Sequence, residues 1–246
     1  MKIFLILLSF SLISPVFSFT LSSGKQQPTL IELYTSEGCS SCPPADKWLK
    51  KFKNNKGLWT KVIPLAFHVD YWDYLGWKDK LALPLNSTRQ HAFAAQDLAT
   101  ATYTPEVLQN GQEWRSWRRF FSFIKKPQPS KGTLTLDIQQ DIKLFYSNKS
   151  HSSLIFHFAI LGFDIKHQIL AGENKNKTLT HDFVVLTHQK KTTHNNQVTL
   201  DYPIKLKVKA KRYAVVAWLE NNKKQQPLQA VGAWLETDMV EKLIFF

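Results

Sequence analysis

The stretch TLIELYTSEGCSSCPPAD (Thr29–Asp46) decides the fold that this sequence predicts. It opens with a short β-type run and a turn signal, and two cysteines three positions apart, Cys39 and Cys42, follow the turn. Apolar residues then recur with the spacing of an amphipathic helix between Ala45 and Phe52. The next apolar run, Val62–Val69, has the composition of a buried parallel strand. The order strand, cysteine turn, helix, strand predicts a βαβ unit.

Two helices and a hairpin are expected to complete the first half of the chain. Alanine-rich sequence favours a helix over residues 81–101. A Thr104-Pro105 step leads into a short strand, and Asn110-Gly111 behind it is a strong hairpin signal. A final helix is expected over Trp114–Lys125, where basic and aromatic residues mix. Its aromatic face would cover the sheet with the arginines in solvent, and contact with a membrane surface or nucleic acid is the alternative.

The texture of the sequence changes at about residue 127. Short segments, some of them alternating, are separated by turns rich in Asn, Lys and Gly. Seven or eight such strands indicate a β-sandwich, either separate or packed on the first half. We therefore expect an α/β domain at residues 19–127 and a β-rich, sandwich-like domain at residues 128–246. The expected strands are Thr133–Ile138, Ile142–Tyr146, Leu154–Phe163, Thr178–Thr187, Val198–Tyr202, Ile204–Val208, Tyr213–Leu219 and Leu228–Leu235.

The amino terminus predicts export. Residues 1–18 combine one positive charge, a short apolar run and small residues where a cleavage site would lie, which is the pattern of a secretory signal peptide. An uncleaved amino-terminal anchor is the alternative. We expect a periplasmic or secreted protein from which the signal peptide has been removed.

The chain is strongly basic. Its formal charge of +13, carried mostly by scattered lysines, favours contact with anionic membrane surfaces or acidic partners. A chain this basic could also bind nucleic acid, but export argues against nucleic acid as the natural partner.

Cys39 and Cys42 are the only cysteines. A zinc site would need a second pair of ligands at matching spacing, and a disulfide scaffold would use more cysteines, so we expect no metal and no cofactor. In an oxidising compartment an isolated C-x-x-C pair indicates a reversible dithiol. The start of a helix favours a thiolate at Cys39, the expected nucleophile, and Cys42 would then be the resolving thiol. A static structural disulfide is the alternative.

Polar and aromatic residues follow the second strand, at the edge of the sheet where the cysteine turn also lies. His68 or Asp70 could carry a proton for Cys42, or they could fix the loop that follows them together with Asp73. A metal site of these three residues ranks lower because the spacing is unselective. Trp72 and Trp77 could line an apolar groove for a polypeptide substrate or cover the core.

Four motifs together resemble a thioredoxin-like family of secreted bacterial proteins that is catalogued as a domain of unknown function. These motifs are TSEGCSSCPPAD (Thr35–Asp46), PLAFHVDYWDYLGWKD (Pro64–Asp79), Arg89-Gln90 and YTPEVLQNG (Tyr103–Gly111), with a later LGFD and GEN pattern at Leu161–Asp164 and Gly172-Glu173-Asn174.

The resemblance implies a thioredoxin-like fold with the C-x-x-C pair as its site, and it supplies no substrate. In such folds a cis proline lies opposite the cysteines, which assigns that place to Pro105 and leaves the Thr104 backbone free to pair with an extended substrate. By contrast, the Gly172-Glu173-Asn174 sequence by itself needs no role beyond turning the chain.

The leading hypothesis is an exported thiol–disulfide oxidoreductase that acts on protein or small-thiol substrates through Cys39 and Cys42. The rival hypothesis is a non-enzymatic binding or scaffold protein in which the first half is a framework. In that case the β-rich half would hold a partner or a metal, and the cysteine pair would be a static disulfide or a pair of ligands for a soft metal.

Overall fold

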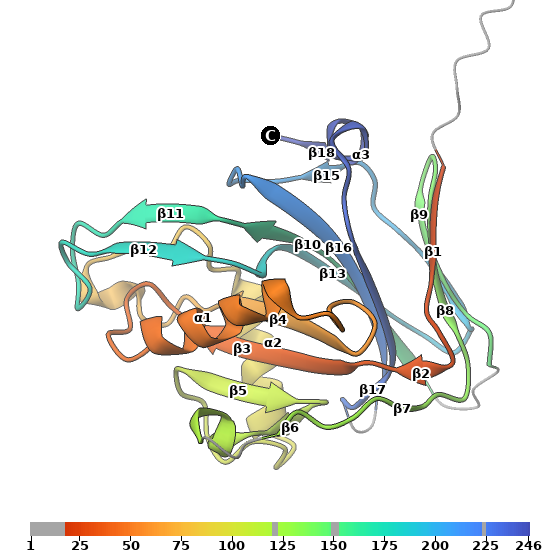
Figure 1. Cartoon of the computed structure of the whole chain (residues 1–246), viewed down its shortest axis with the longest axis horizontal. Coiled ribbons are helices and arrows are strands. Elements are labelled where there is room, and N and C mark those ends of the chain that lie inside the picture. Colours follow the sequence, from red (N-terminus) through yellow and green to blue (C-terminus); the bar gives the residue numbers. More distant parts are fainter. Residues whose placement is uncertain (1–17, 120–122, 149–152, 223–224) are drawn as a thin grey trace, which may run out of the picture.

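The predicted βαβ unit is present at the centre of the structure (Figure 1). In the computed structural model, which describes residues 18–119, 123–148, 153–222 and 225–246, β3 (Thr29–Thr35) and β4 (Val62–His68) are parallel neighbours. Between them lie α1 (Pro43–Lys50) and the 3₁₀ helix η1 (Lys51–Asn54). The expected signal peptide falls almost entirely on residues 1–17, outside the described residues.

The predicted hairpin is also confirmed. β5 (Glu106–Gln109) runs antiparallel to β3, and the Asn110-Gly111 turn connects it to β6 (Gln112–Glu113). Asn110 and Gly111 have φ values of 51° and 73°. These are left-handed values at both central positions, as a tight hairpin turn requires.

The expected helices are shorter than the sequence suggests. The first of them is α2 (Pro84–Ala94), which begins at a proline that fits the first turn of a helix. The helix expected at 114–125 is wrong over its described part, where only the 3₁₀ helix η3 (Arg115–Arg118) forms. The Trp114 backbone N–H donates to the Val107 carbonyl (2.7 Å), and this strand-type bond keeps Trp114 out of a helix. Residues 120–122 lie outside the described residues.

The second half is rich in strands, as predicted. Five strands match closely: β8 (Leu134–Ile138), β9 (Ile142–Tyr146), β10 (Leu154–Phe163), β16 (Arg212–Asn221) and β17 (Pro227–Trp234). The strands expected at 198–202 and 204–208 are present as the shorter β14 (Gln197–Leu200) and β15 (Ile204–Lys205).

One expected strand is interrupted, and several elements were not expected. The run 178–187 divides into β12 (Thr178–His181) and β13 (Val184–Thr193), because Phe183 takes a left-handed φ of 60° between them. The unexpected elements are β1 (Phe19–Ser22), β2 (Gln26–Gln27), the 3₁₀ helix η2 (Asp73–Leu75), β7 (Gln128–Pro129), β11 (Ile165–Gln168), α3 (Thr237–Leu243) and β18 (Ile244–Phe245).

A single mixed sheet joins the two halves of the chain. Its eight strands have the order β17-β16-β10-β13-β4-β3-β5-β6. At the junction β13 runs parallel to β4, with Val184 opposite Ala66, and the Ala66 N–H donates to the Phe183 carbonyl (2.9 Å). The division into domains at residues 19–127 and 128–246 stays a prediction, and the strands of the two parts share this sheet.

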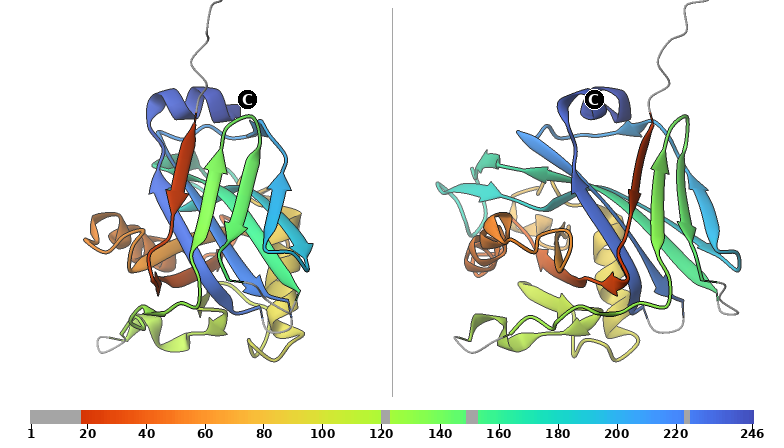
Figure 2. Two further views of the ribbon diagram at one scale, coloured as in Figure 1. Left: turned by 90° about the vertical axis from the view of Figure 1, so that its right-hand side faces the viewer. Right: turned by 45° about the vertical axis from the view of Figure 1, so that its right-hand side comes forward.

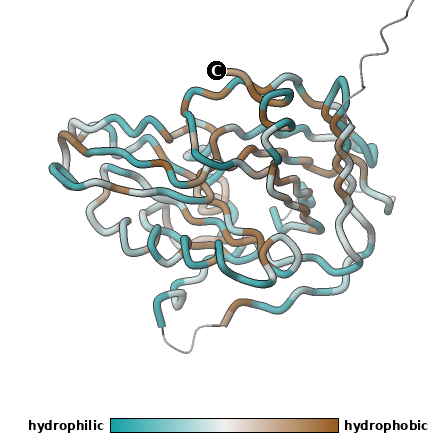
Figure 3. Tube along the Cα trace, turned by 45° about the horizontal axis from the view of Figure 1, so that its top comes forward, coloured by the Kyte–Doolittle hydropathy of each residue, from teal (hydrophilic) through white to brown (hydrophobic). Residues whose placement is uncertain are grey.

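A second sheet of four strands, in the order β1-β8-β9-β14, stacks against one part of the large sheet (Figure 2). Alternation along β10 supplies the two cores. Phe156, Phe158 and Ile160 face the four-stranded sheet, whereas Ala159 and Leu161 belong to the core around β3, β4, α1 and α2. Figure 3 shows the apolar segments concentrated on the inner strands and the hydrophilic ones on the peripheral turns.

A buried ion cluster also ties the halves together. Arg89 on α2 donates to both carboxylate oxygens of Glu32 on β3, at 2.7 and 3.0 Å, and to the carboxylate of Glu220 on β16. All three side chains are at least 94% buried, so their charges are matched with each other rather than with water.

Candidate functional site

The Cys39–Cys42 pair forms a disulfide at the start of α1, with the two Cα atoms 5.5 Å apart. β3 ends at Thr35, and the Cys39 N–H closes a turn on the Ser36 carbonyl (3.2 Å). Cys42 is the residue that caps α1, and two prolines fill its first two positions. These prolines are tolerated there because the first helical N–H groups have no partner inside the helix. The cysteine pair therefore lies where the sequence predicts it, between β3 and α1.

Both cysteines are covered in this oxidised form. Cys39 is 1% exposed and Cys42 is fully buried, while Ser40 and Ser41 between them are exposed. The Ser41 hydroxyl lies 3.3 Å from the Cys39 sulfur. A reaction at Cys39 consequently requires a local displacement of the turn that carries it.

A pocket of about 460 Å³ opens beside this turn, which we call the cysteine pocket. The Thr104–Pro105 peptide is cis, as the sequence predicts, and Pro105 lies in the pocket wall together with Ser41. The full lining is Ser41, Tyr103, Pro105, Arg115, Trp117 and Arg118. The structure thus brings the cysteine turn and the predicted proline to one cavity.

The loop after β4 reaches the same region. The Trp72 indole N–H donates to the Thr104 hydroxyl (2.7 Å), so this tryptophan braces the residue before Pro105. Gly38 permits the approach of the loop, because a β-carbon at this position would lie 3.0 Å from the Trp72 Cβ. Of the two predicted groove residues, Trp72 is half-buried here, and Trp77 donates to the Glu37 carboxylate (2.9 Å) rather than lining the pocket.

Glu37 is a fully buried carboxylate two residues before Cys39. Besides the bond from Trp77, it accepts hydrogen bonds from His167 Nδ1 (2.7 Å) and His181 Nε2 (3.1 Å). Burial would raise the pKa of Glu37, but the two imidazoles outweigh burial and hold this pKa well below its usual range. A permanent negative charge therefore lies close to the cysteine turn.

A second buried pair adjoins Glu37. The Asp79 carboxylate accepts from His68 Nδ1 (2.7 Å) and from the Glu37 backbone N–H (2.9 Å). Burial disfavours the charged imidazole, yet Asp79 raises the pKa of His68 to about 9. The predicted proton carrier is therefore held as a cation by Asp79. Asp70, the other candidate, accepts a hydrogen bond from Ser87 on α2 and helps to fix the loop.

The cysteine turn is hydrogen-bonded to the turn between β11 and β12. We call this second turn the GEN turn, after Gly172-Glu173-Asn174. The buried Asn174 amide donates to the carbonyls of Glu37 and Cys39, both at 2.9 Å. The Ser40 N–H donates to the Glu173 carboxylate (2.8 Å). The expectation that this sequence serves only to turn the chain is therefore wrong. Sequence reasoning also missed His167, His181 and Asp79 as partners of the site.

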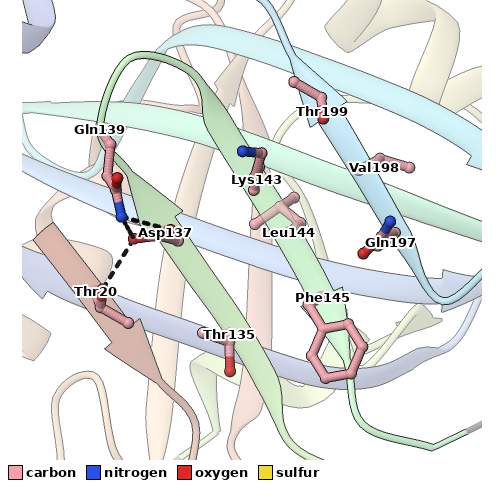
Figure 4. Close-up of a pocket in the computed structure, with 10 residues that line it drawn as sticks. All are labelled: Thr20, Thr135, Asp137, Gln139, Lys143, Leu144, Phe145, Gln197, Val198 and Thr199. Atoms are coloured by element: carbon pink, nitrogen blue, oxygen red, sulfur yellow. Dashed lines mark hydrogen bonds between the residues drawn. The ribbon is translucent and has the colours of Figure 1, made fainter. Parts of the chain in front are cut away.

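A separate pocket of about 360 Å³ lies on the outer face of the four-stranded sheet (Figure 4). Its walls come mostly from polar and exposed side chains of β1, β8, β9 and β14, and the Asp137 carboxylate there accepts hydrogen bonds from Thr20 and Gln139. None of the predicted site residues lines this pocket.

Neither a metal cluster nor a membrane helix is found. Among the described residues no group of three or more His, Cys, Asp or Glu side chains is arranged to hold a metal ion. Within the same residues, no helix has the length and apolar character needed to cross a bilayer.

Comparison with known proteins gives a family and a fold but no activity. The family model described as "Protein of unknown function (DUF1223)" matches residues 30–220. No curated protein matches the chain. The crystal structure of protein AGR_C_4864 from Agrobacterium tumefaciens is 22% identical, with a TM-score of 0.52 over 87% of this chain and 94% of that chain. HBP35 of Porphyromonas gingivalis is 11% identical, with a TM-score of 0.53 over 87% of this chain and 77% of that chain. At these identities both likenesses concern the fold alone.

Proposed function

Because this chain belongs to the DUF1223 family, whose description assigns no activity, we propose a function from the site itself: an exported, thioredoxin-like thiol–disulfide oxidoreductase. One observation carries the proposal. The disulfide at the start of α1 adjoins a pocket of about 460 Å³ that is lined by both Ser41 of the cysteine turn and Pro105. A substrate in this pocket would lie beside the cysteine turn, with its reacting sulfur close to Cys39 once that turn is displaced.

The thioredoxin-like assignment is supported by the arrangement of the central elements. β3, α1 and β4 form a parallel βαβ unit, and β5 joins the other side of β3 in the antiparallel sense. The cysteines lie at the carboxyl end of β3 and Pro105 directly precedes β5. The cysteine pair and Pro105 therefore lie at the same edge of the sheet.

The exchange that we propose starts from the oxidised pair. A substrate thiolate attacks the Cys39 sulfur, which forms a mixed disulfide and breaks the Cys39–Cys42 bond, and Cys42 leaves as a thiolate. A second substrate thiolate then attacks the substrate sulfur of the mixed disulfide and releases Cys39 as a thiolate. The substrate dithiol loses two electrons and becomes a disulfide, and the protein gains them. The reverse sequence reduces a substrate disulfide.

The site favours Cys39 as the attacked and attacking sulfur for electrostatic reasons. Pro43 and Pro44 supply no N–H at the start of α1, so the nearest group that can donate to a Cys39 thiolate is the Ser41 hydroxyl, 3.3 Å from the sulfur. The positive end of the helix dipole acts in the same sense, whereas the anionic Glu37 opposes a thiolate. The Glu37 charge is largely compensated by its hydrogen bonds to His167 and His181.

The test is to compare Cys39→Ser with Cys42→Ser in the exported protein. The Cys42→Ser variant should accumulate mixed disulfides through Cys39, with either protein or small-thiol partners, and Cys39→Ser should accumulate few or none. Sequencing the amino terminus of the exported protein tests the signal peptide, which we expect to end near residue 18.

A static disulfide in a binding or scaffold protein is the second candidate, and the burial of both cysteines favours it. The same two variants separate the candidates, since a scaffold forms no mixed disulfide in either. The reduction potential of the pair provides an independent measurement, because a value below about −300 mV is typical of structural disulfides.

A further inference from the structure

We propose that the cysteine pocket selects polypeptide substrates with an acidic side chain close to their reacting cysteine, and that Arg118 recognises this side chain. The inference rests on the proposed exchange function. It names the class of substrate for the same site.

The cysteine pocket is bounded by Ser41 of the cysteine turn and by a group of basic and aromatic side chains. Ser41 forms part of the wall, and its hydroxyl lies 3.3 Å from the Cys39 sulfur. Arg115, Trp117 and Arg118, all on η3, form another part. An occupant of this pocket therefore lies beside the cysteine turn and also beside the η3 side chains.

The two arginines of the pocket differ in how their charges are matched. Arg115 donates to the Glu113 carboxylate (2.6 Å) and lies over the Tyr103 ring at 5.8 Å, so its charge already has an internal partner. Arg118 has its guanidinium carbon 4.7 Å from the centre of the Trp117 ring and makes no ion pair in the part of the chain that the structure describes.

Arg118 is thus an exposed cation held in place by a buried aromatic ring. Stacking on Trp117 reduces the freedom that Arg118 would lose on binding, while its N–H groups stay available. No acidic residue lines the cysteine pocket, so nothing within the lining competes for this charge. A carboxylate is the group that complements a planar guanidinium best.

An acidic polypeptide fits these features as an occupant. Pro105 and the cation of Arg118 line the same pocket, and an extended chain in it would pair with the backbone beside Pro105. A side-chain carboxylate a residue or two from the substrate cysteine would then reach Arg118 while the cysteine lies beside Cys39.

The experiment uses the full mature chain carrying Cys42→Ser and three synthetic peptides. The peptides differ only in the residue two positions after their single cysteine, which is Glu, Gln or Lys. Each cysteine is blocked as a mixed disulfide with thionitrobenzoate. The Cys39 thiolate attacks the peptide sulfur, a Cys39–peptide disulfide forms, and coloured thionitrobenzoate leaves with the electron pair of the broken bond. The rate of colour release measures the reaction.

We expect the Glu peptide to react about three- to tenfold faster than the Lys peptide at low salt, with the Gln peptide between them. This preference should shrink as salt is added, because the charges are exposed. Arg118→Gln should bring the ratio of the Glu-peptide rate to the Lys-peptide rate close to one. Arg118→Lys should retain part of it. Arg119→Gln is the matched control, since Arg119 is exposed next to Arg118 but does not line the pocket.

The possible failures can be told apart. Equal rates for the three peptides, or a preference that survives Arg118→Gln, would overturn the assignment of Arg118 and leave the exchange function standing. If no peptide reacts at Cys39, the proposed function fails and the inference fails with it.

Discussion

Asn174→Ala is the substitution that examines most directly how the disulfide is covered. Asn174 donates from one amide nitrogen to the carbonyls of Glu37 and Cys39, and its side chain is fully buried. A net contribution of about 1 kcal/mol for each hydrogen bond gives about 2 kcal/mol in favour of the closed cysteine turn. Loss of both bonds should therefore raise the population of the open turn about 30-fold.

The assay is the rate at which a small dithiol reduces the Cys39–Cys42 disulfide under native conditions. Samples are quenched with an alkylating reagent and the reduced fraction is counted by mass spectrometry. Because both cysteines are at most 1% exposed, reduction should proceed through an opened form. The rate should then rise about 30-fold in Asn174→Ala, in step with the open population.

Two controls identify the motion responsible. Lys175→Ala changes an exposed neighbour in the same turn and should leave the rate unaltered. Phe156→Leu destabilises the distant core between the sheets, and should lower the stability of the whole protein without accelerating reduction. Equal acceleration by Phe156→Leu would mean that reduction follows global unfolding, and an unchanged rate in a folded Asn174→Ala protein would refute the role of the GEN turn.

Three further predictions concern buried charges, and each is measured by urea unfolding. Since Asp79 raises the pKa of His68 from 6.5 to about 9, this pair should contribute its full stability below about pH 6.5 and lose it as pH rises through 9. Asp79→Asn should flatten that part of the curve of unfolding free energy against pH. A curve for Asp79→Asn that runs parallel to the wild-type curve would count against the pair. Burial raises the pKa of Glu106 from 4.5 to about 7, so ionisation destabilises the fold as pH rises through this range, and Glu106→Gln should stabilise the protein more at pH 8 than at pH 4. Removing one member of the buried Arg89 cluster with Glu220→Gln should cost about 3–5 kcal/mol, and a loss below about 1 kcal/mol would show that the cluster does not hold the halves together.

Local signals in the sequence were sufficient for the elements around the cysteines. The apolar run of β3, the helical spacing after Cys42 and the Asn110-Gly111 turn each depend on neighbouring residues only. The sequence also predicted that the cysteine turn and the loop after His68 lie at the same edge of the sheet, because neighbouring parallel strands end at the same edge.

The contacts that complete the site depend on residues far apart in the sequence. Glu37 meets His167 and His181 across 130 and 144 positions, and Asn174 reaches Glu37 across 137. No periodicity within a short window reports such pairings. The one available signal was chemical, since a carboxylate beside a buried turn needs donors and the strands of the second half carry two histidines that face it.

The pairing of β13 with β4 was also beyond local reasoning. It depends on the left-handed φ of Phe183, which ends β12 and lets the chain enter the large sheet beside Ala66. An aromatic residue rarely takes that conformation, so the sequence did not indicate that the expected strand at 178–187 is interrupted at Phe183.

The hydrogen bonds of Glu37 limit how this protein can be divided into fragments that keep the site intact. Of the three side chains that donate to its carboxylate, only Trp77 precedes residue 128, and the others arrive with β11 and β12. A fragment that stops at the predicted boundary would retain both sulfurs and lose two of the three hydrogen bonds that the Glu37 carboxylate accepts from side chains. The cysteine turn therefore cannot be moved to another protein as a short segment, because the residues that contact it come from both halves of the chain.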